Sequence, residues 1–154
     1  MEPTLLKKET EILLDMMGIH VKEVIIIQDL DLHITIISVR AGGNETELFR
    51  ENNESVLRDF TLILKQLIEK KYHQYKDIIV DLNGENKKHL DLLKQQAQIA
   101  VERVEFFDKP YEFGYLNAYE RMIIHSYLKN KKDIVTESYG ERNERSLVIK
   151  KNTA

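Results

Sequence analysis

The residues best suited to chemistry lie near the carboxyl end of the chain, where Arg121 and His125 stand four positions apart. On an α-helix this spacing leaves the two side chains about 40° apart around the axis, so they point the same way. An arginine supplies a permanent charge and a planar stacking surface, and a histidine supplies a donor and a flat ring. Together they could hold a phosphate and stack a base. The alternative is ordinary helix surface, because any long helix offers many such pairs.

Further cations follow this pair and could contact phosphates: Lys129, Lys131, Lys132, Arg142 and Arg145. The lysines equally suit the end of a helix, which carries partial negative charge. The two arginines could instead pair with Glu141 and Glu144. Tyr119 and Tyr139 could stack bases or pack against apolar neighbours.

The charge distribution directs the search to the same end of the chain. The net charge is −3 over 154 residues. Residues 1–84 hold 10 Lys and Arg against 15 Asp and Glu, whereas residues 85–154 hold 13 against 11. We therefore expect a polyanion to bind the second half.

Several classes of chemistry have no support in the sequence. There is no cysteine, so zinc–thiolate sites and cysteine nucleophiles are excluded. No apolar run reaches the ~18 residues of a membrane helix. Asp29 and Asp31 begin like a calcium loop, but Ile34 stands where that loop needs glycine. No catalytic triad order, phosphate-cradling glycine loop or nucleotide fingerprint is present. We expect no enzyme activity, no cofactor and no metal.

The first half carries the signals of one small α+β unit over residues 1–84. Apolar residues at helical spacing end at Gly18, a residue that readily closes a helix. Runs rich in β-branched residues predict strands, and apolar periodicity predicts helices. The expected order is α-β-β-α-α-β, with strands over Val21–Gln28, Leu32–Arg40 and Lys76–Leu82, and later helices over Glu45–Arg50 and Ser55–Lys71.

The second half predicts a connecting helix over residues 85–108 and a further α/β unit over residues 109–154. Pro110 breaks the long helix. Asn117 is a suitable N-cap for a helix over Leu116–Leu128. Short strands are expected over Tyr111–Phe113, Ile134–Ser138 and Arg145–Lys150.

Three stretches, Leu116–His125, Asp133–Glu141 and Arg145–Ile149, together resemble the R-three-H domain over about residues 110–151. That domain is named for its Arg-x-x-x-His helix and binds single-stranded nucleic acid. The version here is similar to the C-terminal domain of the bacterial Jag proteins, also called SpoIIIJ-associated or KhpB proteins. The resemblance implies binding through Arg121 and His125, with the following cations as phosphate contacts.

Jag proteins place a KH domain before this one, and the α-β-β-α-α-β order is that of a type II KH domain. A working KH domain clamps nucleotides with a Gly-x-x-Gly loop. Here Arg50-Glu51-Asn52-Asn53 occupies that loop without a glycine, and Glu54 adds negative charge. We expect this degenerate KH-like unit to serve docking or dimerisation rather than RNA binding. The Jag-N domain of longer family members is not expected.

The leading hypothesis is non-catalytic RNA or single-stranded nucleic-acid binding by a bacterial, cytoplasmic, Jag-like regulator. The alternative is a protein-interaction adaptor that has lost RNA binding. The resemblance alone implies a KH-domain partner, or a homodimer through the KH-like unit, and a YidC/SpoIIIJ-type insertase. The protein itself is not expected to be embedded in a membrane.

Overall fold

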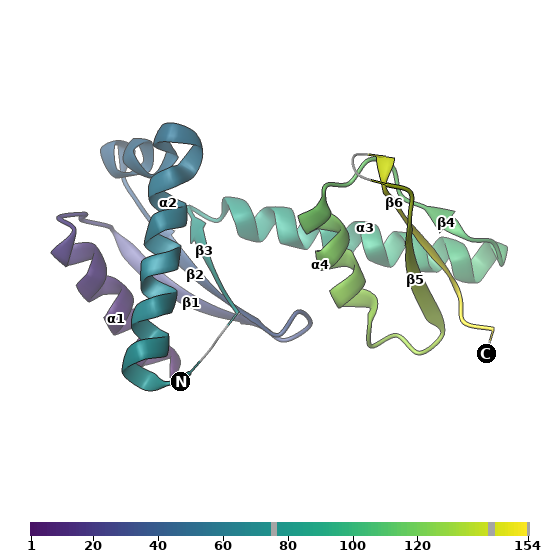
Figure 1. Cartoon of the computed structure of the whole chain (residues 1–154), viewed down its shortest axis with the longest axis horizontal. Helices are drawn as coiled ribbons and strands as arrows, with labels where there is room; N and C mark the ends of the chain where they lie inside the picture. Colours follow the sequence, from purple (N-terminus) through teal and green to yellow (C-terminus); the bar gives the residue numbers. More distant parts are fainter. Residues whose placement is uncertain (75–76, 142–143, 154) are drawn as a thin grey trace. The chain divides into compact units, whose positions relative to one another are not determined.

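The structure is a computed structural model, and it describes residues 1–74, 77–141 and 144–153 (Figure 1). The chain divides into two compact units, Met1–Lys87 and Lys88–Ala154. Both units mix helices with a small sheet, so the predicted α+β class is confirmed. Within the described residues, no helix combines the length and the apolar character needed to cross a membrane.

In the part that the structure describes, the first unit contains two helices and one mixed three-stranded sheet. Its elements are α1 (Pro3–Met16), β1 (Glu23–Asp29), β2 (Ile34–Arg40), α2 (Gly43–Tyr72) and β3 (Ile78–Leu82). The strand order is β1-β2-β3, with β1 antiparallel and β3 parallel to β2. Gly18 has a φ of 71°, and Ile19 N–H donates to the Leu14 carbonyl oxygen, so α1 ends where the sequence predicted.

The core of this unit lies between the helices and one face of the sheet. Ile37 and Val80 are register partners on β2 and β3, and both are buried with Phe49, Phe60 and Leu64 of α2. The apolar residues of α1 are not all buried. Met16 is 79% exposed, whereas the polar residue Glu9 is only 4% exposed.

Glu9 is buried because it has partners on the other helix. Its Oε1 accepts a hydrogen bond from Lys71 Nζ at 2.6 Å and another from the Tyr72 hydroxyl. These hydrogen bonds to Lys71 and Tyr72 hold the pKa of the Glu9 carboxyl below its ordinary value. The cluster therefore joins α1 to the end of α2 through a charged group.

α2 is two helical segments separated by a break at Glu51–Glu54. Glu51 is extended, with a ψ of 149°, and Asn52, Asn53 and Glu54 all have positive φ. The break confirms the two successive helices of the predicted order. The expected loop began one residue too early, because Arg50 is still helical.

Asp81 at the end of β3 organises the start of the next helix. Its carboxylate is fully buried and accepts from Ser38 Oγ at 2.7 Å and from Gly84 N–H at 2.9 Å. It also accepts from the backbone N–H groups of Asn86 and Lys87. These N–H groups open a helix and would otherwise lack acceptors, so Asp81 fixes where that helix begins.

Among its described residues, the second unit has two helices and a three-stranded antiparallel sheet of order β4-β6-β5. Its elements are α3 (Glu85–Phe107), β4 (Tyr111–Glu112), α4 (Ala118–Leu128), β5 (Ile134–Tyr139) and β6 (Ser146–Lys151). The division between the units falls at Lys87, so nearly all of α3 belongs to the second unit. The buried stripe of α3 runs from Leu90 to Val104.

Candidate nucleic-acid interface

The first turn of α4 is fixed by a reciprocal cap. Asn117 Oδ1 accepts from Glu120 N–H at 2.9 Å, and Glu120 Oε2 accepts from Asn117 N–H at 2.8 Å. This capping box satisfies two N–H groups that would otherwise be unpaired. The predicted role of Asn117 is confirmed, and the cap places Arg121 one turn into the helix.

Arg121 is half-buried and bonded to the backbone of its own unit. Its Nη1 donates to the carbonyl oxygen of Leu116 at 2.6 Å and to that of Arg145 at 3.2 Å. Arg121 is therefore tied into the fold of its own unit and is only partly exposed to solvent. The guanidinium joins the segment before α4 to the residue that precedes β6. Among the described residues, Nη2 and Nε of Arg121 have no hydrogen-bond partner.

His125 is exposed, and one of its ring nitrogens is occupied. Nδ1 is hydrogen-bonded to Thr136 Oγ1 on β5. Within the described part of the chain, Nε2 has no partner. Thr136 therefore fixes the ring while the second nitrogen stays accessible to a ligand. The stretch Asp133–Glu141, which carries part of the family resemblance, gains a role here, since its Thr136 orients the histidine.

Arg121 and His125 reach the same sheet from one side of α4. The contact of Arg121 lies just before β6, and that of His125 lies on β5, the neighbouring strand. The predicted common face is therefore present. Tyr119, two residues before Arg121, is about 160° away around the helix and does not share this face. Partial burial raises the pKa of the Tyr119 hydroxyl, which stays neutral at physiological pH.

The remaining predicted cations are not gathered into one cluster. Arg145 is exposed beside Arg121, whereas Lys129 and Lys132 are exposed beyond the C-terminal end of α4. A helix of 11 residues is about 16 Å long, so the two groups lie at opposite ends of it. Lys131 is half-buried, and its Nζ donates to Gln98 Oε1 on α3 at 2.8 Å. Arg142 lies outside the described residues.

The carboxylates near this face are partly neutralised. Glu137 on β5 forms an ion pair with Lys150 of β6 at 2.7 Å and accepts a hydrogen bond from the Tyr139 hydroxyl. Among the described residues, the side chain of Arg145 has no acidic partner. It stays available, together with His125 Nε2, for an anion.

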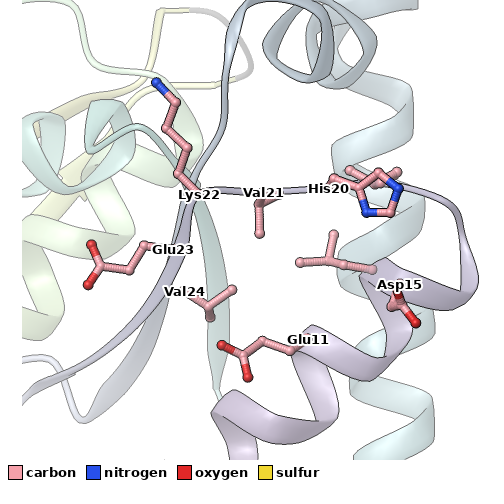
Figure 2. A pocket seen from close by; sticks show the side chains of 9 residues that line it. Glu11, Asp15, His20, Val21, Lys22, Glu23 and Val24 are labelled. Atoms are coloured by element: carbon pink, nitrogen blue, oxygen red, sulfur yellow. The ribbon is translucent and has the colours of Figure 1, made fainter.

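The first unit has a separate hollow at the end of α1, which Figure 2 shows. Val21 and Val24 point toward it, while Lys22 and Glu23 point away. Three carboxylates are among its lining residues. No three of the described His, Asp and Glu side chains are placed so that they could hold a metal ion. Among the described residues, the hollow therefore offers no candidate metal site.

Residues 91–151 match the family model of the R-three-H domain. This match supports an R-three-H domain in the second unit, and it extends the region of about 110–151 back into α3. Such domains generally bind nucleic acid, which supports single-stranded nucleic-acid binding by the second unit. No curated protein matches the chain.

Proposed function

We propose that the protein binds single-stranded RNA, without catalysis, through the face that carries Arg121 and His125. The observation that carries the proposal is the orientation of His125, whose ring is held by Thr136 with Nε2 exposed. The ring and the guanidinium of Arg121 supply flat surfaces for bases and donors for phosphate. Arg145 extends the positive face at the same end of α4.

Lys129 and Lys132 are proposed as secondary phosphate contacts. Both are exposed, but they lie past the far end of α4, so only a strand longer than the Arg121 face would reach them. Lys131 is expected to contribute less, because its ammonium group is already bonded to Gln98. We propose the same secondary role for Arg142 on the basis of its sequence position alone.

The first unit is proposed to be a degenerate KH-like unit that does not bind RNA. The α-β-β-α-α-β order and mixed sheet support the likeness. The loop of a working KH domain needs close backbone approach to phosphates, whereas this break carries Glu51 and Glu54. We further propose that this unit serves docking or dimerisation in a Jag-like bacterial cytoplasmic regulator, with a KH-domain protein or an insertase as partner. This part of the proposal rests on the family resemblance alone.

Fluorescence anisotropy with a labelled oligouridine tests the RNA proposal. We expect His125→Ala to weaken binding about fivefold or more, because stacking contributes ~1–3 kcal/mol per base. His20→Ala removes an exposed histidine of the first unit and should have no effect. With about three phosphates neutralised, the log–log salt slope of wild type should be near −2, from ~0.7 per phosphate.

Two results would overturn the proposal, and the first of them would favour the adaptor alternative. One is a wild-type protein without affinity for single strands at low salt. The other is binding that survives the combined His125→Ala and Arg145→Gln changes, because the affinity would then reside elsewhere in the chain. The acidic first unit and its glycine-free loop are the observations that favour the alternative.

A further inference from the structure

A groove lies between α3 and the segment around β4, which is an edge strand of the second sheet. Two adjoining hollows of about 330 and 430 Å³ form it, and both are lined by Arg103 and Tyr111. Tyr115 lines the first hollow, and Phe107 and Lys109 line the second. None of these residues was predicted from the sequence to belong to a binding site.

The lining combines flat apolar surfaces with positive charge. Tyr115 is 82% exposed and Phe107 is 62% exposed, which is unusual for large aromatic side chains. The Arg103 guanidinium lies 5.7 Å from the centroid of the Tyr111 ring. The chain has 26 Asp and Glu residues, yet none of the residues that line either hollow is acidic. This combination suits an anion that has stackable rings.

The groove is continuous with the Arg121 face through one segment of backbone. Leu116 lines the first hollow, and its carbonyl oxygen accepts the short hydrogen bond from Arg121 Nη1. Tyr115 is the adjacent residue. The exposed aromatic ring of Tyr115 therefore stands next in the chain to the residue that Arg121 contacts.

We propose that this groove binds the continuation of the same single-stranded nucleic acid, with a base stacked on Tyr115 and phosphates near Arg103 and Lys109. The inference rests on the proposed function and extends its footprint beyond the Arg121 face. A proline-rich peptide would use the aromatic rings but would gain nothing from the two cations, so the charge of the lining favours nucleic acid.

Full-length protein and labelled oligouridines of about 4 and about 12 nucleotides test the proposal, since these lengths bracket small single-strand sites. Wild type should bind the longer strand more tightly. Tyr115→Ala should weaken the longer complex about tenfold and leave the shorter one unchanged. Tyr115→Phe keeps the ring and should retain the affinity. His125→Ala should weaken both complexes.

Salt dependence tests the cationic part of the groove. Arg103→Gln should reduce the salt slope of the longer complex by about 0.7. Lys88→Ala removes an exposed cation of the same helix that lines neither hollow, and it should leave the slope unchanged.

The outcomes separate this inference from the function on which it rests. If wild type binds neither strand, the proposed function fails. If wild type binds the shorter strand but gains nothing with length, or if Tyr115→Ala has no effect, the groove is not part of the site. A third outcome would also overturn the proposal. In it, a proline-rich peptide binds saturably, Tyr115→Ala abolishes that binding, and the same change leaves the affinity for RNA unaltered.

Discussion

Replacing Arg121 with alanine should destabilise the second unit as well as weaken ligand binding. The hydrogen bond to Leu116 is charge-assisted, 2.6 Å long and partly buried, and such bonds contribute about 1.5–3 kcal/mol. The bond to Arg145 is 3.2 Å long and exposed, so it should add less than about 1 kcal/mol. We therefore expect the free energy of unfolding to fall by about 2–3 kcal/mol.

Calorimetry of the full-length protein, combined with amide hydrogen exchange, can measure this loss and assign it to one unit. For a unit the size of Lys88–Ala154, each kcal/mol corresponds to about 4–8 °C in the melting temperature. Arg121→Lys keeps the charge but loses the planar fork, so it should recover only part of the stability. Lys129→Ala, at an exposed position, should change the stability by less than about 0.5 kcal/mol.

Unchanged amide protection across residues 88–154 in the Arg121→Ala variant would refute a structural role for this arginine. The two carbonyl contacts would then contribute nothing to folding, and Arg121 would act as a ligand contact alone. Affinities of the variant must be measured well below its melting temperature, so that loss of binding is not confused with loss of fold.

Three further predictions concern the first unit, and urea denaturation of the full-length protein tests each of them. The folded-state pKa of Glu9 lies below its ordinary value of 4.5. The ionised carboxyl therefore stabilises the fold above pH 4.5, and this stabilisation is lost as the pH falls through the folded-state pKa. Glu9→Gln should flatten this acid dependence. Asp81→Ala leaves Ser38 Oγ and three backbone N–H groups without their acceptor, so it should lower the free energy of unfolding by about 3 kcal/mol or more. Ser38→Ala removes only one of these hydrogen bonds and should lower it by about 1 kcal/mol. Glu54→Gly should raise the free energy of unfolding by about 1 kcal/mol, because Glu54 has a φ of 62° and glycine removes the steric cost of that conformation. An unchanged or lower urea midpoint would contradict backbone strain at this position.

Local signals in the sequence predicted much of the fold. The cap at Asn117 and the stop at Gly18 depend on residue type and on contacts within a few positions, so both could be read from the sequence. The β-branched runs predicted the strands to within two or three residues. Arg121 and His125 were placed on one face because helix geometry alone determines that relation.

Long-range pairings could not be read in the same way. The burial of Glu9 depends on Lys71, 62 positions away, and the partial burial of Lys131 depends on Gln98. Helical periodicity identified the apolar stripe of α3, but it could not show which unit buries that stripe. The helix was expected to connect the two units, and in the structure it falls almost wholly within the second. The hydrogen bonds of Arg121 could not be predicted for another reason, because its partners are main-chain oxygen atoms.

That choice of partners affects how the sequence around Arg121 can vary. The guanidinium is bound by the carbonyl oxygens of Leu116 and Arg145. Every residue type has a carbonyl oxygen, so substitution at either position can preserve the acceptor as long as the backbone keeps its path. The interaction joins three positions but restricts the choice of amino acid at only one of them. Position 145, which is exposed, can therefore diverge to suit different ligands while the helix and the strand stay tied together, whereas Leu116 is also held by its burial in the core.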